Sequence, residues 1–273
     1  MRTETPVQIK LSDYTPYPFA IDQVEMVFDL EPSATRVHTK MVVRSVDEAR
    51  TKVDASRMKL DGVLLKLDEI RLNGAILGDD AYELDDEALV LTDVPDAFTL
   101  ETTVTIDPSA NTALSGLYVS GDRFCSQCES VGFRRITYWP DRPDVMSRFK
   151  VRIEADKATY PVLLSNGTAG ESGDLDGGRH FAEWDDPHPK PSYLFALCAG
   201  DYDIYRDTFT TMSGADVDLA VHVDKGDGAR AAWAATPLNK LDGGVAASAR
   251  LFQRRPDALN PNPGRPIITP PLR

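Results

Sequence analysis

The sequence predicts an all-β fold, in which an antiparallel domain of two packed sheets is followed by an irregular C-terminal tail. Three observations predict it. Apolar and polar residues alternate with a period of two in several short runs, which is typical of half-buried strands. Turn residues separate these runs, and no stretch of ten residues before Gly226 has a convincing helical pattern. Short strands without intervening helices favour antiparallel sheets that pack face to face.

The first expected element is a hairpin near the N-terminus. In residues 24–30 (VEMVFDL), an apolar side chain at every second position alternates with Glu25, Val27 and Asp29. Residues 36–43 (RVHTKMVV) are rich in β-branched side chains, and the EPSAT segment between the two runs carries turn residues. Both runs therefore predict strands that pair with each other.

Further strands are predicted along the chain, separated by residues that favour turns. The runs that predict them are LDGVLLKLDEIRLNG, EALVLTDVP, FTLETTVTIDP, RFKVRIEAD, YPVLLSNG and YLFALCAGDYDIY. Asn73-Gly74, Asn166-Gly167 and Asp176-Gly177 supply residues that tolerate the positive φ angles of tight connections. The predicted β-domain spans residues 1–225.

Residues 226–273 have a different composition and form the predicted tail. They contain seven Lys or Arg, three Asp and no Glu, whereas the whole chain has a net charge of -13. The closing stretch RRPDALNPNPGRPIITPPLR is rich in proline and has no aromatic residue. Such a composition cannot form a packed core, so we expect the tail to be poorly ordered.

Charge and composition exclude several classes of function. A net charge of -13 argues against nucleic acid as a partner, because phosphate binding relies on concentrated Lys and Arg. An acidic surface can instead attract cations such as peptide N-termini. No run of eighteen apolar residues predicts a membrane span, and the first residues, MRTETPVQIKLSDY, are too polar for a signal peptide. With only three cysteines, the chain is expected to be cytoplasmic and to have no disulfide framework.

The segment from Phe124 to Val145, FCSQCESVGFRRITYWPDRPDV, is dense in residues that loops use for chemistry. Its CxxC pair, Cys125 and Cys128, could form half of a zinc site or a redox pair. A structural zinc site needs four ligands, however, and a redox CxxC usually begins a helix. The rest of the chain offers only Cys198 and the scattered histidines His38, His180, His188 and His222. We therefore expect structural thiols and no metal bound by this chain.

Glu129 and Gln127 are the candidate binding residues of this segment. A carboxylate in a pocket with little water can hold the α-ammonium group of a peptide, because the Coulomb attraction is weakly screened there. Gln127 lies two residues away and would face the same side of an extended chain, where its amide could contact the first side chain or carbonyl of the peptide. A solvated acid without a function is the alternative.

The remaining polar clusters predict structure rather than chemistry. Local salt bridges that stiffen the loop are expected from Arg134, Arg135 and Arg142 beside Asp141 and Asp144. The segment HFAEWDDPHPKP, from His180 to Pro191, predicts a rigid turn between strands because of its spaced prolines.

The aromatic pair of the same loop has its own interpretation. Tyr138 and Trp139 are expected to pack the loop onto a sheet, and the acidic charge of the chain disfavours a base-stacking role for them.

Residues 13 to about 234 resemble the N-terminal β-domain of bacterial aminopeptidase N. The resemblance is carried by NTALSGLY, SGDRFCSQCESVGFRRITYWPDRPDV, LLSNG, the segment from His180 that ends in YLFAL, and AGDYDIYRDTFTT. It implies a saddle-like sandwich whose Gln-Cys-Glu loop reaches into the active site of the next domain. Glu129 then matches the glutamate that binds the substrate α-amine, and Gln127 matches the glutamine that lines the first side-chain pocket.

The catalytic motifs of that zinc hydrolase family cannot be found. The family holds zinc with HExxH and a distant Glu, whereas no His of this sequence is followed by Glu, and no GxMEN segment occurs. The departure begins near Ala235, which indicates a truncated or frame-shifted product or a short homologue. We expect no catalytic residue here and no activity of this chain alone. A stand-alone β-sandwich scaffold that binds another protein and a split aminopeptidase completed in trans are the alternatives.

Overall fold

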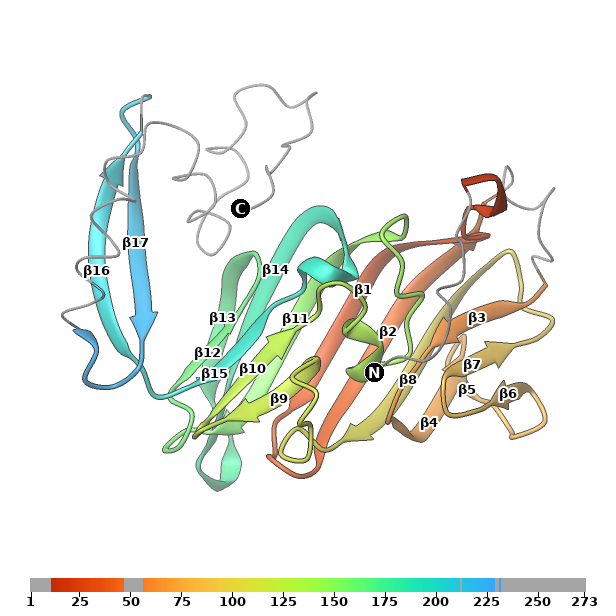
Figure 1. Ribbon diagram of the computed structural model, residues 1–273, viewed down its shortest axis with the longest axis horizontal. Coiled ribbons are helices and arrows are strands. Elements are labelled where there is room, and N and C mark those ends of the chain that lie inside the picture. Colours follow the sequence, from red (N-terminus) through yellow and green to blue (C-terminus); the bar gives the residue numbers. More distant parts are fainter. Residues whose placement is uncertain (1–10, 47–55, 212, 229–230, 232–273) are drawn as a thin grey trace, which may run out of the picture.

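The computed structural model describes residues 11–46, 56–211, 213–228 and 231 (Figure 1). Strands make up most of the regular structure of these residues, with four three-residue 3-10 helices among them, which confirms the predicted all-β fold. The strands are β1 Phe19–Asp29, β2 Thr35–Ser45, β3 Met58–Asp61, β4 Lys66–Leu72, β5 Ala75–Ile76, β6 Tyr82–Leu84, β7 Ala88–Leu91, β8 Ala97–Ile106, β9 Gly116–Ser120, β10 Arg123–Gln127, β11 Met146–Asp156, β12 Val162–Ser165, β13 Thr168–Asp174, β14 Arg179–Pro191, β15 Leu197–Gly200, β16 Asp203–Thr210 and β17 Asp216–Val223. The 3-10 helices are η1 Leu11–Asp13, η2 Phe133–Arg135, η3 Asp176–Gly178 and η4 Ser192–Leu194.

The strands form one large sheet and three smaller ones. The large sheet has the order β13-β14-β11-β1-β2-β8-β4-β5, and a four-stranded sheet has the order β12-β15-β10-β9. Figure 1 shows the β3-β7-β6 sheet at one end of the molecule and the β16-β17 hairpin at the other. Among the described strands, only the β1-β11 pair is parallel. The predicted sandwich thus corresponds to the two larger sheets, and the smaller sheets extend it.

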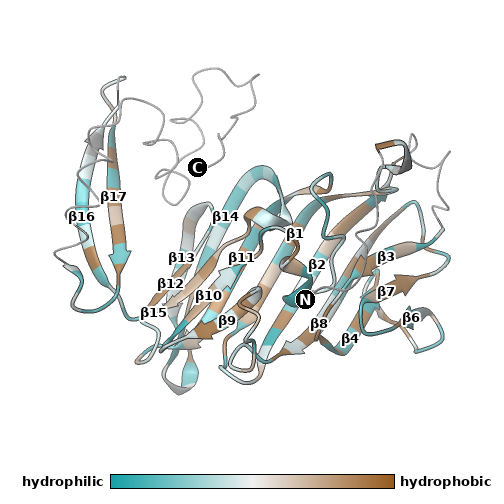
Figure 2. Ribbon diagram, viewed as in Figure 1, coloured by the Kyte–Doolittle hydropathy of each residue, from teal (hydrophilic) through white to brown (hydrophobic). Residues whose placement is uncertain are grey.

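Local sequence signals explain the hairpins. β1 and β2 pair antiparallel from Phe19↔Ser45 to Asp29↔Arg36, as the alternation of residues 24–43 predicts. Asn73 and Gly74 connect β4 to β5 with φ angles of 50 and 81 degrees, which the predicted tight turn requires. Figure 2 shows apolar and polar segments succeeding one another along the strands of the large sheet, as expected when one face is buried.

The core lies between the eight-stranded and four-stranded sheets. Phe28 of β1 stacks on Phe195, with the ring centroids 5.9 Å apart. Phe133 of η2 meets Phe195 edge to face at 5.2 Å. Phe124 of β10 is fully buried against Tyr160. Burial of such a side chain contributes about 1.5–3 kcal/mol. This aromatic cluster therefore fixes β10 and η2, the two elements that flank the candidate binding residues.

The segment from His180 to Pro191 belongs to a strand and is not the predicted turn between strands. β14 pairs with β11 through Asp186↔Phe149 and Lys190↔Ser147, so Pro187, His188 and Pro189 bulge out where the register shifts. Prolines fit a bulge because they have no N–H to donate to the sheet. The structural interpretation of this segment holds, but its geometry is that of an interrupted strand.

One prediction falls almost wholly outside the described residues. The irregular tail, residues 226–273, is described only at 226–228 and 231, so its boundary and poor order stay predictions.

No helix in the described ranges is long and apolar enough to span a bilayer.

Candidate functional site

The loop that connects β10 to β11 is fastened to two sheets by its aromatic residues. Trp139 and Asp61 of β3 exchange backbone hydrogen bonds, with N···O distances of 3.0 Å and 2.8 Å. The Trp139 ring is fully buried and lies 5.4 Å from the Phe133 ring. Tyr138 is also buried. The predicted packing of both aromatic residues onto a sheet is confirmed, with the β3-β7-β6 sheet as one of the partners.

Asp141 is the centre of a buried ion network in this loop. Its side chain is 1% exposed and accepts hydrogen bonds at 3.2 Å from both the backbone N and Nε of Arg134. The hydroxyl of Ser192 donates to its other oxygen at 2.7 Å. The backbone N of Asp141 donates to Asp61 at 3.2 Å, and Arg134 also lies 3.5 Å from Asp61. The network ties the loop to η4 and β3.

A second ion pair fixes the end of the loop. Arg142 donates to both carboxylate oxygens of Asp144 at 2.8 Å and 2.7 Å, and also to the carbonyl of Thr15 at 2.7 Å. The Tyr14 hydroxyl donates to Asp144 at 2.9 Å. These contacts confirm the predicted salt bridges for two of the three arginines. Arg135 forms no ion pair with any residue that the structure describes, so its predicted salt bridge is wrong.

Gln127 and Glu129 lie together at the tip that this framework holds. Gln127 is the last residue of β10 and pairs with Gly116 of β9. Its amide Nε2 lies 3.5 Å from the carbonyl oxygen of Glu129, and both side chains are exposed. Within the described part of the chain, the Glu129 carboxylate has no hydrogen bond or ion pair. The peptide bond from Glu129 to Ser130 is cis. The two predicted residues thus lie side by side. The Glu129 carboxylate is available to accept a hydrogen bond from a ligand.

Gly132 closes the turn beneath these two residues. Its backbone N donates to the carbonyl of Cys128 at 2.8 Å. A Cβ on Gly132 would lie 2.4 Å from the carbonyl oxygen of Gln127 and 3.0 Å from Cα of Cys128. Because both atoms belong to the backbone, they cannot move aside as a flexible side chain would. Position 132 therefore has no room for a side chain, and only glycine fits there without a shift of the backbone.

We expect Gly132→Ala to destabilise the chain by about 1–3 kcal/mol, because overpacking forces the backbone to shift. Urea unfolding of the two proteins measures this change. Gly78→Ala is the matched control, since a Cβ there approaches only the side chain of Asp80. Equal unfolding midpoints for Gly132→Ala and the unmodified chain would contradict the close packing of this turn.

The two cysteines of the CxxC motif do not face each other as a pair. Cys128 is buried in the core, and burial raises the pKa of its thiol. Cys125 is partly exposed and lies opposite Cys198 of β15 in the strand register. The interpretation of Cys128 as a structural thiol agrees with this burial. The sequence motif groups Cys125 with the wrong neighbour, because the spacing does not reveal which strands become adjacent.

The described residues of this chain do not fit a zinc site. Within the described ranges, no three His, Cys, Asp or Glu side chains gather closely enough to hold a metal ion. His38 contacts the hydroxyl of Thr103 at 3.1 Å, and His180 contacts the carbonyl of Tyr160 at 2.8 Å. A zinc site needs three or four such ligands converging on one point.

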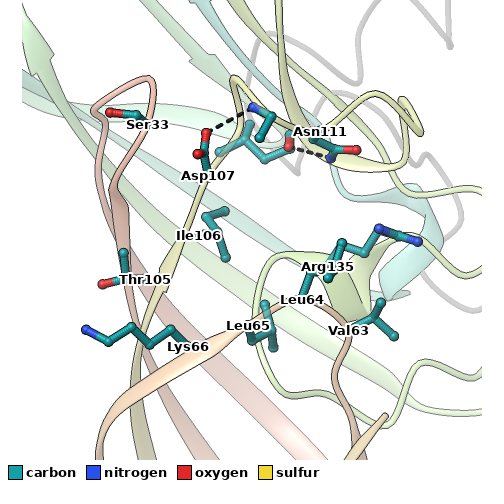
Figure 3. A pocket seen from close by; sticks show the side chains of 12 residues that line it. Ser33, Val63, Leu64, Leu65, Lys66, Thr105, Ile106, Asp107, Asn111 and Arg135 are labelled. Carbon is teal, nitrogen blue, oxygen red and sulfur yellow. Dashed lines mark hydrogen bonds between the residues drawn. The ribbon is translucent and has the colours of Figure 1, made fainter. Parts of the chain in front are cut away.

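The lining of a pocket of about 480 Å³ does not include Gln127 or Glu129. Figure 3 shows Leu64, Leu65, Ile106 and Arg135 around it, and none of the residues from Cys128 to Gly132 contributes to its lining. The Asn111 side chain donates to the carbonyls of Ser115 and Leu117 at 2.8 Å and 2.9 Å. These hydrogen bonds stabilise the loop before β9. No motif of the sequence predicts the pocket.

Known proteins resemble this chain in sequence over most of its length. Aminopeptidase N of Caulobacter vibrioides is 55% identical over 240 residues, which are 88% of this chain and 27% of that protein. Aminopeptidase N of Escherichia coli is 46% identical over 246 residues, which are 86% of this chain and 26% of that protein. The chain therefore spans about a quarter of the length of these curated relatives.

Solved structures share the fold. The crystal structure of Legionella pneumophila aminopeptidase A in complex with aspartic acid matches with a TM-score of 0.80 and 31% identity, over 90% of this chain and 29% of that one. An M1 zinc metallopeptidase from Deinococcus radiodurans matches with a TM-score of 0.62 over 78% of this chain and 52% of that one; at 15% identity it shows the fold alone.

The family comparison agrees with the relatives and with the architecture. The Peptidase M1 N-terminal domain family matches residues 30–194, which run from β2 to η4 and include the tip with Gln127 and Glu129. This match covers more than half of the chain. The all-β fold and the ordered loop between β10 and β11 are therefore those of a known domain, and the chain belongs to the Peptidase M1 N-terminal domain family.

Proposed function

We propose that this domain anchors the N-terminal residue of a peptide for the catalytic domain of a zinc aminopeptidase. Glu129 binds the α-ammonium group of the peptide, and Gln127 lines the pocket for the first side chain. The partners are thus peptide N-termini and a catalytic domain, and the place of action is the cytoplasm. The removal of N-terminal amino acids from peptides is the activity that the domain serves.

This proposal is supported by the Glu129 carboxylate, which has no hydrogen bond or ion pair among the described residues. It is exposed on a tip whose backbone is fixed by Gly132 and by the ion network of Asp141. A carboxylate that is already positioned needs little reorganisation to accept a charge-assisted hydrogen bond from an ammonium group. The attraction strengthens when a second domain covers the tip and excludes water, because the effective dielectric constant falls.

The amide of Gln127 supplies directional contacts beside that charge. An amide offers two N–H donors and one carbonyl acceptor, and the 3.5 Å contact with the Glu129 carbonyl uses at most one donor. The remaining groups are free to meet the polar backbone of a peptide or its first side chain. A substitution at Gln127 should therefore alter the preference among first residues more than the affinity for the amine.

Hydrolysis itself requires groups that these residues do not supply. A zinc ion held by the catalytic domain would supply the Lewis acidity that turns water into a nucleophile at neutral pH. Residues of this chain hold and orient the peptide end, and the zinc ligands belong to the catalytic domain. The comparisons do not favour a stand-alone scaffold module, since the relatives over this segment are aminopeptidases.

A hybrid enzyme tests the proposal. In aminopeptidase N of Caulobacter vibrioides, the segment that aligns with this chain is replaced by the corresponding residues of this chain. The hybrid should hydrolyse an alanyl or leucyl amide with free α-amine and should lose this activity with a chelator. The isolated chain with added zinc should show no turnover. A soluble hybrid that binds zinc but does not hydrolyse the amide would contradict the proposal, as would chelator-sensitive turnover by the isolated chain.

A further inference from the structure

Two partly exposed thiols lie side by side on the four-stranded sheet. Cys125 of β10 and Cys198 of β15 are direct partners in the antiparallel register, and both are free thiols. Opposite residues of antiparallel strands have Cα atoms about 4.5–5.5 Å apart. A disulfide needs a Cα separation of about 4.4–6.8 Å. The register therefore places the two sulfur atoms where a bond between them requires little movement of the backbone.

The surroundings of Cys125 favour its thiolate. The charged and titratable groups that face it are Arg123 on its own strand, Tyr118 on β9, Cys198 on β15 and Tyr202 after β15. The hydrogen bond with Cys198, helped by the charge of Arg123, lowers the pKa of Cys125 to about 7. The same hydrogen bond and burial raise the pKa of Cys198. Cys125 is thus the nucleophile of the pair, and Cys198 is the proton donor to it.

The arginine is held in place beside the thiols. Arg123 forms an ion pair with Asp224, and its guanidinium carbon lies 5.9 Å from the centroid of the Tyr202 ring. Its side chain crosses Gly200, where a Cβ would lie 2.5 Å from Cγ of Arg123. Only glycine leaves room for this path at position 200. A cationic group close to a half-exposed thiolate is the environment of reactive cysteines.

Cys128 is unsuited to the same chemistry. It is 2% exposed, it belongs to the hydrophobic core, and burial raises the pKa of its thiol. The CxxC spacing therefore does not define the reactive pair. The partner of Cys125 is the cysteine that the sheet brings to it, although the two are far apart in the sequence.

We propose that Cys125 and Cys198 form a reactive dithiol that a hydroperoxide converts into a cross-strand disulfide. The Cys125 thiolate attacks one peroxide oxygen and breaks the O–O bond, which gives a sulfenic acid and hydroxide that takes up a proton to form water. Cys198, as its thiolate, then attacks the sulfur of the sulfenic acid, forms the S–S bond and displaces hydroxide, which leaves as water. Two thiols are oxidised and one hydrogen peroxide is reduced to two waters. A small-molecule dithiol restores the pair by exchange.

The modification lies on the strand that ends in the candidate binding tip. Cys125 precedes Gln127 by two residues on β10, so a bond to β15 ties the base of the tip to its neighbour.

Mass spectrometry of the full chain tests the proposal. After treatment with hydrogen peroxide, the chain should lose two hydrogen atoms in mass and recover them with dithiothreitol. Cleavage after Arg123, Arg134, Arg179 and Arg206 places Cys198 in peptide 180–206, while Cys125 and Cys128 share peptide 124–134. The two peptides should be linked. Peptide 124–134 with an internal disulfide, or a stable sulfenic acid in the unmodified chain, would overturn the proposal.

Variants assign the sulfur atoms. Cys128→Ala should still form the link, which would identify Cys125 as the partner of Cys198. Cys198→Ser should stop at a sulfenic acid on Cys125 that dimedone traps, and Cys125→Ser should form no link. Loss of the link in Cys128→Ala, when circular dichroism shows that this variant is folded, would overturn the assignment.

The pH dependence of alkylation provides a second measurement on the unmodified chain. The thiolate is the reacting form, so the rate at Cys125 should rise with pH and reach half its maximum near a pKa of about 7. In Cys198→Ala the midpoint should move upward, because no side chain at that position donates a hydrogen bond to the thiolate. An ordinary cysteine has its midpoint at about 8.5. Such a midpoint for Cys125 in the unmodified chain would overturn its role as the nucleophile.

Discussion

Glu129→Gln in the hybrid enzyme is expected to lower kcat/KM for an aminoacyl amide by roughly 100- to 1000-fold, because it removes the charge that holds the substrate amine. The two side chains have nearly the same shape, so the loop should keep its conformation. A loss of this size corresponds to about 3–4 kcal/mol of transition-state stabilisation. Initial rates at low substrate concentration measure it directly.

Two further variants separate charge from position. Glu171→Gln removes a carboxylate of β13 that is also exposed and should leave kcat/KM unchanged. Glu129→Asp keeps the charge but shortens its reach, so an intermediate loss is expected. If Glu129→Gln and Glu171→Gln gave the same rates, Glu129 would be a solvated acid and the anchoring role would fail. Thermal unfolding of each hybrid shows whether a lost activity reflects lost structure.

Asp141→Ala is expected to destabilise the isolated chain by about 3–5 kcal/mol, since it leaves Arg134 without its buried partner. It also removes the acceptor of the Ser192 hydroxyl, which is itself buried. Urea unfolding followed by tryptophan fluorescence suits this measurement, because Trp139 is buried in the same loop. The unfolding midpoint should fall well below that of the unmodified chain.

An exposed ion pair is the control for Asp141. Asp22 pairs with Arg44 at 2.8 Å, and both side chains are 54% exposed. Asp22→Ala should therefore cost less than about 1 kcal/mol. Equal shifts for Asp22→Ala and Asp141→Ala would show that the burial of Asp141 does not strengthen its network. Asp141→Asn keeps an acceptor for Ser192 and should fall between the two.

Local patterns predict much of the fold. Alternation in residues 24–43 predicts a hairpin, and β1 and β2 form it, because the register of a half-buried hairpin follows from its apolar positions and its turn. Asn73-Gly74 predicts a tight connection for a similar local reason, since glycine accepts a positive φ without strain. The predicted packing of Trp139 follows from its large apolar area.

Long-range pairings are not encoded in the same way. The parallel pair β1-β11 has the same alternation as an antiparallel pair, so periodicity cannot distinguish the two. The approach of Cys125 to Cys198 depends on which strands become neighbours in the four-stranded sheet. Arg135 was expected to form a salt bridge because acids are close in the sequence, but η2 turns its backbone over Gly116 and directs the side chain to the pocket.

The candidate site was predicted from a resemblance more than from spacing. Spacing alone favours a solvated acid at Glu129 over a binding role. The structure adds the fixed turn at Gly132 and the absence of any partner for the Glu129 carboxylate among the described residues. The roles of Gln127 and Glu129 remain predictions that the hybrid enzyme tests.

The parallel pairing at the centre of the large sheet constrains how the chain folds during synthesis. β1 can pair with β2 as soon as Ser45 has left the ribosome, but its other edge stays open until Met146–Asp156 has been made. Until then, a long apolar strand presents unpaired backbone groups, which makes nascent chains prone to associate. Interruption of translation between these two points should therefore yield aggregates, whereas release after β14 should yield a chain whose central strands are all paired.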